Sequence, residues 1–311
     1  MHSKGRPGSK PDEPGVKMDR LVFAIITEIM GIMSLRDKPW ARPVLGSVLQ
    51  LPVRLLAEKL MRLEENVAAQ GWSAAMGMFL SDFVTDYRVR GLENVPKTGP
   101  LLVVCNHPGS YDMPILSTVM GRDDLKIIAS DISIVRQLPN IMEHFIFISR
   151  DPHKSMLTVR SALRHLHGGG GLLIFPRGEV EPDQDVTPGA LPDFERWSPS
   201  PELFLRKVPQ TRVLVVFAKG VLSPRWFQSL FVRMWKKPAR RQKVAEVFQV
   251  VQQLIGKKGF SLTPSLFFSP LFTVDDLGSI ASPTGHLLTA MIQQVRALID
   301  APADPLAGEK V

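Results

Sequence analysis

His107 and Asp112 are the residues whose types and spacing most directly suggest chemistry. They stand in the run Asn106-His107-Pro108-Gly109-Ser110-Tyr111-Asp112, directly after the apolar stretch 101–105. An imidazole can act as a general base, and a carboxylate can orient it and stabilise its protonated form. A spacing of five does not align two side chains on one helical face, so Pro108 and Gly109 must turn the chain for the two to meet. The run predicts an acid–base pair where a strand ends and the helix 113–120 begins.

The same residues have simpler interpretations. A His can end a core strand and an Asp can cap a helix, so a His-x4-Asp spacing alone is weak. Cys105 lies on the same strand face as His107, where it could be a nucleophile or core filling. A lipase using Ser110 is disfavoured because the Gly-x-Ser-x-Gly turn is missing. The surrounding sequence has to decide.

The elements around the pair indicate an α/β fold. From Tyr87 onward, short apolar runs alternate with helical stretches, which is typical of a sheet with helices on its faces. We expect a mixed central sheet with helices on both faces, preceded by an N-terminal helical, membrane-associating segment with two or three helices between Asp19 and Asp86. The expected strands are at 87–91, 101–105, 125–128, 145–148, 172–175 and 213–217, and further helices at 155–167 and 244–255.

Both ends of the chain are poor in bulky apolar residues, so 1–17 and 301–311 are predicted to be flexible tails. Between them we expect a helical segment, 18–86, and a catalytic domain, 87–300. The apolar stretch Leu21 to Leu35 contains Glu28 and is shorter than the roughly 20 residues a bilayer requires. No small-residue cleavage site follows it, which disfavours a secretory signal.

Three sequence blocks in order carry a family resemblance. Gly99-Pro100, the apolar strand and Asn106 to Asp112 resemble the first signature block of the glycerolipid (1-acylglycerol-3-phosphate, or lysophospholipid) acyltransferases. The strand Phe145 to Arg150, which ends in Arg, resembles the second block. The third, Phe-Pro-Glu-Gly-Thr-Arg, is partly matched by Phe175-Pro176-Arg177-Gly178-Glu179-Val180. The fourth is degenerate, with Phe217 where a proline is expected, so the resemblance covers 87–221.

The resemblance implies transfer of an acyl group from acyl-carrier protein or acyl-CoA to a lysophospholipid hydroxyl, with lysophosphatidate as the default acceptor and no cofactor or metal. His107 would be the base and Asp112 its orienting partner, and Arg150 would bind the headgroup. Arg177 would replace the arginine missing at Val180, and the Gly178 amide could contribute to an oxyanion hole. The expected substrate-binding set is Asn106, Gly109, Ser110, Arg150, Phe175, Pro176, Arg177, Gly178 and Glu179. The acids that follow, Glu179, Glu181, Asp183 and Asp185, suit a cationic headgroup or, preferably, a solvated loop.

Two alternatives remain open at this point. The acceptor could be glycerol 3-phosphate, or the chain could be a lipid-binding protein with a decayed site, which the altered third and fourth blocks favour. Incubating the protein with a labelled acyl donor and a panel of acceptors distinguishes these alternatives.

The charge of the chain indicates an anionic partner, which could be nucleic acid, a phosphorylated substrate or an acidic membrane surface. The formal charge is +8 and the isoelectric point is near 9.7. Neither an RNA-binding aromatic signature nor a zinc finger is present, so we expect no nucleic-acid partner, and one cysteine excludes an intramolecular disulfide. In 223–243 basic residues alternate with membrane-contact candidates, Trp226, Phe227, Phe231 and Trp235. A core-packed helix with a basic rim fits equally well. We expect a peripheral or monotopic protein on the cytoplasmic face of the cell membrane.

Overall fold

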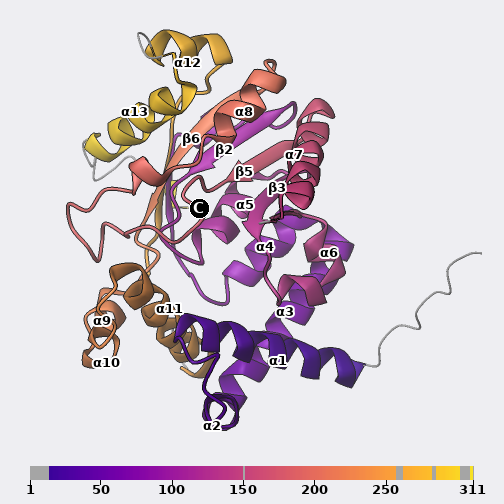
Figure 1. The fold of residues 1–311 in the computed structure, drawn as a ribbon, viewed down its shortest axis with the longest axis vertical. Coiled ribbons are helices and arrows are strands. Elements are labelled where there is room, and N and C mark those ends of the chain that lie inside the picture. The colour runs from indigo at the N-terminus through magenta and orange to yellow at the C-terminus, as the bar shows by residue number, and fades with distance from the viewer. Residues whose placement is uncertain (1–13, 150, 257–261, 282–284, 302–308, 311) are drawn as a thin grey trace, which may run out of the picture.

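The computed structural model describes residues 14–149, 151–256, 262–281, 285–301 and 309–310. Its centre is one mixed sheet with helices on both faces (Figure 1). The strands lie in the order β4-β3-β5-β2-β6-β7-β1-β8. Their bounds are β1 Arg88–Arg90, β2 Leu101–Cys105, β3 Lys126–Ser130, β4 Phe145–Ile148, β5 Gly171–Ile174, β6 Arg212–Lys219, β7 Ser265–Phe268 and β8 Glu309–Lys310.

The five strands from β4 to β6 are parallel, whereas β7 pairs antiparallel with β6, β1 parallel with β7, and β8 antiparallel with β1. The prediction of a mixed sheet is therefore confirmed. Parallel strands place their carboxyl ends along one edge, and ligands of open α/β sheets bind at that edge. The segments that follow β2, β3, β4 and β5 consequently meet there.

Alternating side chains of β2 show why both faces are covered. Leu101, Val103 and Cys105 belong to one buried apolar cluster, and Leu102 and Val104 belong to another. The first cluster includes residues of α1–α5, and the second includes residues of α7, α8, α12 and α13. Since successive strand residues point to opposite faces, each face of the sheet needs its own helical layer.

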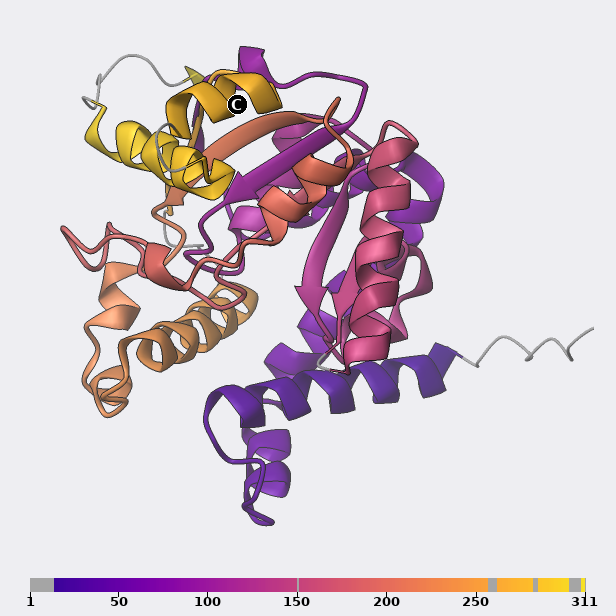
Figure 2. The same cartoon turned by 45° about the horizontal axis from the view of Figure 1, so that its top comes forward.

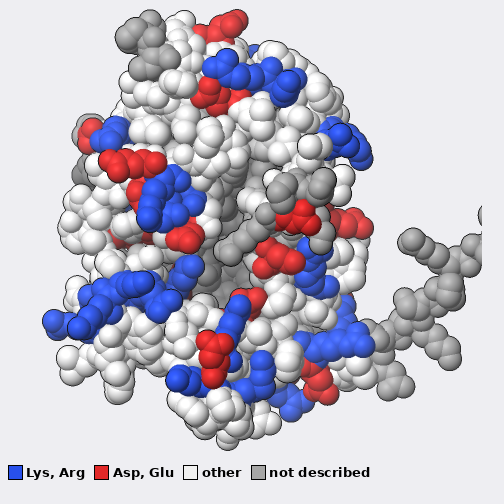
Figure 3. Space-filling view, in the orientation of Figure 1, with Lys and Arg blue, Asp and Glu red and all other residues white. Residues whose placement is uncertain are grey.

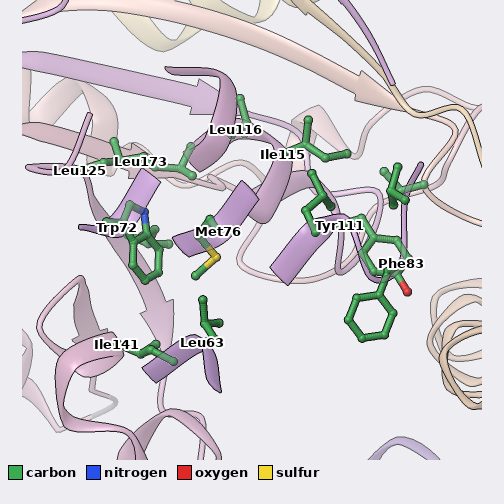
Figure 4. Packing of buried hydrophobic residues seen from close by; sticks show 14 of the residues in the cluster. Leu63, Trp72, Met76, Phe83, Tyr111, Ile115, Leu116, Leu125, Ile141 and Leu173 are labelled. Atoms are coloured by element: carbon green, nitrogen blue, oxygen red, sulfur yellow. The ribbon is translucent and has the colours of Figure 1, made fainter. Parts of the chain in front are cut away.

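Helices α3, α4 and α5 form the layer beneath the predicted reactive pair. Trp72 of α4 is fully buried, and Figure 4 shows it near Met76 and Leu63, with Ile115 of α5 packed on the same cluster. This apolar layer fixes the position of α5, whose first residue is Asp112. The helices run α1 Pro14–Ile32, α2 Ala41–Val48, α3 Gln50–Gln70, α4 Trp72–Leu80, α5 Asp112–Met120, α6 Pro139–Met142, α7 Pro152–His167, α8 Ser200–Lys207, α9 Pro224–Phe227, α10 Leu230–Arg233, α11 Pro238–Ile255, α12 Val274–Ala281 and α13 Leu287–Asp300.

The structure departs from the sequence prediction at several elements. The N-terminal region has four helices rather than two or three, and the strands before and after Gly99 do not pair with each other. The stretch 223–243 is not one helix: it is α9, α10 and the start of α11, because Pro224 and Pro238 are accommodated only at helix starts.

The predicted tails fall mainly on 1–13 and 302–308, outside the described residues. Helix α1 begins at Pro14, and Glu309 and Lys310 pair with β1. The division at 86 and 300 stays a prediction. Within the described part of the chain, no helix has the length and apolarity needed to cross a membrane.

Candidate active site

The turn after β2 brings His107 and Asp112 together. The Nδ1 atom of His107 lies 2.8 Å from Oδ2 of Asp112. Asp112 is fully buried, whereas the His107 side chain is 27% exposed. An Nδ1–H that donates to the carboxylate leaves Nε2 as the basic nitrogen. The predicted meeting of these two side chains is confirmed, and their catalytic roles stay a prediction.

Backbone amides hold the carboxylate in place. Oδ2 of Asp112 also accepts from the Gly109 amide at 3.2 Å, and Oδ1 accepts from the Met113 amide at 2.6 Å. Because the buried carboxylate accepts from the turn, the imidazole and the start of α5, its position fixes the ring of His107.

A second buried acid fixes the backbone of His107. Oε2 of Glu181 accepts from the His107 amide at 3.1 Å, and the Glu181 amide donates to the His107 carbonyl at 2.7 Å. Oε1 of Glu181 accepts from Trp197 and from the Asp193 amide. Asp183 is likewise buried and accepts from the amides of Gly220 and Leu222. The preferred interpretation of the acids from 179 to 185 as a solvated loop is therefore wrong for these two, which organise backbone.

These acids affect the basicity of His107. Burial lowers the pKa of the imidazole, but the carboxylates of Asp112, Glu246 and Glu181 raise it, and the net pKa lies above its ordinary value. Burial raises the pKa of Glu181, against the hydrogen bonds that Trp197 and backbone amides donate to it. A more basic imidazole is better suited to removing a proton from a hydroxyl.

His107 opens onto a groove of about 1110 Å³ along the carboxyl edge of the parallel strands. Its lining is mainly apolar and includes strand residues 127–129 and 145–148. Phe175 packs beside His107, with ring centroids 4.5 Å apart. Arg136 is the single Lys or Arg among the described lining residues; it lies over the Phe147 ring and forms an ion pair with Asp131 at 2.8 Å. The groove thus combines a base, an apolar wall and one cation.

The structure places Arg177 elsewhere. It lines a different cavity of about 540 Å³, which does not include His107. Its guanidinium donates to Asp193 at 3.0 Å and to Glu179 at 3.2 Å. Two carboxylates therefore balance its charge, and the geometry does not bring it together with the His–Asp pair.

The remaining predicted substrate-binding residues differ in what they contact. Asn106 is fully buried, and its amide donates to and accepts from the Ala218 backbone at 2.8 Å each, which ties the turn to β6. Ser110 and Gly178 line the groove, but the Gly178 amide donates to the Phe175 carbonyl. Pro176 is buried, and Arg150 lies outside the described residues. For all of these, substrate contact stays a prediction.

Sequence reasoning missed a row of buried polar residues on α11. Gln242, Glu246, Gln249 and Gln253 lie at spacings of four, three and four, so they share one helical face. Gln242 donates to the Pro108 carbonyl, Glu246 accepts from the Ser110 amide, and Gln253 accepts from the Tyr111 hydroxyl. The sequence predicts a helix at 244–255, and the spacing of these four polar residues is the signal that they share one face of it.

Of the four predicted membrane contacts, only Phe231 is exposed. Trp226 stacks on Phe248 and donates to Gln252, and Phe227 and Trp235 pack into a small apolar cluster. The exposed apolar residues of this region are Leu230, Phe231 and Met234, which we call the α10 tip; they are 80%, 70% and 75% exposed. Figure 3 shows Lys and Arg side chains gathered beside this region of the surface.

Comparison with known proteins relates part of the chain to a family. Residues 86–223 match the family model described as Acyltransferase, so this part of the chain is an acyltransferase domain. The match confirms the acyltransferase resemblance that the motif blocks predicted, and with it the prediction of an acyltransferase enzyme. Among solved structures, it is similar to the 1-acyl-sn-glycerophosphate (LPA) acyltransferase PlsC from Thermotoga maritima. The identity is 15% and the TM-score 0.41, over 93% of this chain and 97% of that one. The search of curated proteins finds no match.

Proposed function

We propose that the chain transfers an acyl group from a thioester, acyl-CoA or acyl-carrier protein, to the hydroxyl of a lysophospholipid, with lysophosphatidate as the default acceptor. The observation that carries the proposal is the imidazole of His107, held by Asp112, at the end of a largely apolar groove. Such a groove can hold an acyl chain, and a base among its lining residues can take the proton of an acceptor hydroxyl bound in the same groove.

The proposed reaction needs no covalent enzyme intermediate. The acceptor oxygen attacks the thioester carbonyl carbon while Nε2 of His107 takes the hydroxyl proton. The C–S bond then breaks, and the proton passes from the imidazolium to the departing thiolate, which leaves as a thiol. Asp112 stabilises the imidazolium formed in between, through the 2.8 Å contact.

Arg136 supports an anionic acceptor. It lines the same groove as His107, and its pair with Asp131 is solvent-exposed, with side chains 45% and 63% accessible. An exposed pair is weak, so a phosphate can replace the carboxylate as partner. The guanidinium carbon lies 4.0 Å from the centroid of the Phe147 ring, and a guanidinium can form two parallel hydrogen bonds to phosphate oxygens.

The α10 tip supports attachment to an anionic membrane. Exposed apolar side chains beside Arg233, Lys236 and Lys237 suit a lipid interface. Trp40 and Val48 near α2 are also exposed, and Figures 1 and 2 place α2 and α10 toward the same end of the molecule. We place the protein on the cytoplasmic face of the cell membrane on this basis and on its basic charge.

The membrane proposal is tested by sedimentation with anionic vesicles. Phe231→Ser with Met234→Ser should weaken binding, and added salt should weaken binding of the parent protein. Leu203→Ser is the matched control, because Leu203 is an exposed leucine on α8, away from that end. Equal loss in the control variant would contradict the assignment of the tip.

The function itself is tested by incubating the protein with radiolabelled acyl-CoA or acyl-carrier protein and lysophosphatidate, other lysophospholipids or glycerol 3-phosphate. We expect acylated product from lysophosphatidate. Product from glycerol 3-phosphate alone would establish the rival acceptor. Lipid binding without product from any acceptor would favour the non-catalytic alternative, which the altered third block still supports.

A further inference from the structure

The buried polar face of α11 contains three amides and one acid. Gln242, Gln249 and Gln253 contact backbone or side-chain groups through their amides, whereas Glu246 presents a carboxylate. Glu246 is only 8% exposed. Among the members of this row that contact the turn between His107 and Asp112, Glu246 is the one that can carry a charge.

Glu246 touches the turn at two consecutive residues. Its Oε1 atom accepts from the Ser110 amide at 2.6 Å. The same oxygen lies so close to Gly109 that a Cβ atom there would overlap it. A glycine at this position therefore allows the carboxylate to approach the backbone directly.

A hydrogen bond to the Ser110 amide does not require a charge. A glutamine would accept it equally well, as its neighbours on α11 do, without burying a carboxylate. Burying this carboxylate disfavours its charged form, and burial accordingly raises the pKa of Glu246 to about 7. A buried charge in place of an available amide points to an electrostatic role.

The groups that face this carboxylate define that role. Asp112 of α5 and Glu181, which follows β5, act together with Glu246 on His107, and the three carboxylates raise the pKa of its imidazole. Tyr111 and Cys105 are the neutral titratable groups nearby, and their pKa values are raised by burial first and then by these acids. Lys243 and Glu28 line the cavity on the outer side of Glu246.

We propose that Glu246 is a positioning residue for acyl transfer: it fixes the turn through Ser110, and its negative charge favours the imidazolium that His107 forms in the transition state. The inference rests on the proposed function, in which His107 is the base. A negative charge near a developing cation lowers the barrier without contact with either substrate.

The test is Glu246→Gln, which keeps an acceptor for Ser110 and removes the charge. We expect kcat on the alkaline plateau to fall about tenfold or more with KM for both substrates unchanged. In a plot of kcat against pH, the acidic limb should move to lower pH by about half a unit or more, because removing a negative charge lowers the pKa of His107. The thermal midpoint should stay equal or rise, since a buried charge is lost. An NMR titration of the His107 ring should show the same downward shift.

A purely structural role predicts the opposite result. Unchanged kcat and an unmoved acidic limb in Glu246→Gln would overturn the proposal. Gln249→Ala is the matched control: Gln249 bonds Val221 and Ser223, so its loss should lower the thermal midpoint and leave the pH profile in place.

Two further variants keep the outcome unambiguous. If Glu246→Gln does not fold, Glu246→Asp retains the charge on a shorter side chain, and its acidic limb should stay near that of the parent; a limb shifted down by as much as half a unit would also overturn the proposal. His107→Ala is measured beside them. Activity in His107→Ala would refute the proposed function, whereas an inactive His107→Ala with an unaffected Glu246→Gln would refute this inference alone.

Discussion

Residues of the segment 175–181 line two cavities, one with Arg136 and the other with Arg177, and the two arginines differ in which groups share their cavity. In the groove, Arg136 shares the space with His107 and forms an ion pair with the exposed Asp131. The other cavity is not lined by His107, and in it Arg177 is 15% exposed and forms ion pairs with Asp193 and Glu179. Position within a sequence motif thus does not decide which cation faces the reacting groups. The cavity and the existing partners decide it.

The largest effect is expected when the proposed general base in the groove, His107, is removed. His107→Ala should lower kcat by about ten thousandfold, because the proton acceptor is lost while the apolar groove remains. Turnover of radiolabelled acyl donor measures it, and circular dichroism and vesicle binding should match the parent protein. Substantial residual transfer would show that the reaction does not take place at this end of the groove.

Asp112→Asn should have the next largest effect. The amide can no longer hold the Nδ1–H tautomer or stabilise the imidazolium, so kcat should fall by about a thousandfold. Single-turnover rates should show this loss of activity, and the thermal midpoint should stay within a few degrees of that of the parent protein. A decrease of only a few-fold would return Asp112 to a helix-capping role, through its bond to the Met113 amide.

The comparison of the two arginines is tested directly at Arg136. Arg136→Ala should raise the KM for lysophosphatidate by about tenfold and leave the KM for the acyl donor unchanged, because headgroup binding is lost equally in ground and transition states. Arg136→Lys should retain part of the affinity, since a point charge remains. Kinetics with varied acceptor at fixed donor measure both.

The smallest effect should come from Arg177. Arg177→Ala should change the acceptor KM by less than about threefold, since its charge is already balanced by two carboxylates, and should instead lower the thermal midpoint modestly. The sequence alone predicted the reverse, because Arg177 was expected to bind the acceptor in place of the arginine missing at Val180. A tenfold rise in acceptor KM for Arg177→Ala would restore that prediction and break the contrast between the cavities.

The sequence predicted well those features that depend on local pattern. The apolar runs located β2, β3, β4, β5 and β6, since buried parallel strands read as continuous apolar segments. The turn residues Pro108 and Gly109 predicted the contact of His107 with Asp112. The motif blocks identified the acyltransferase family.

Features that depend on distant partners were not predictable in the same way. Glu181 and Asp183 look like solvated acids in the sequence, and only the packing of the 177–196 segment against the turn buries them. The two arginines could not be ranked, because cavity membership depends on how the segment after β5 folds over the sheet. β7 was missed because its strand structure depends on pairing with β6 and β1, and β1 lies far away in the sequence.

The contacts from α11 to the turn show that residues outside the family match help to hold the reactive pair in place. The segment recognisable as acyltransferase ends at residue 223, yet Pro108 and Ser110 are held by Gln242 and Glu246 beyond it. A fragment cut at the family boundary would retain His107 and Asp112 but leave the carbonyl and amide between them without their partners. The smallest piece of the chain able to work is therefore larger than the piece that the family model recognises, because it must include α11.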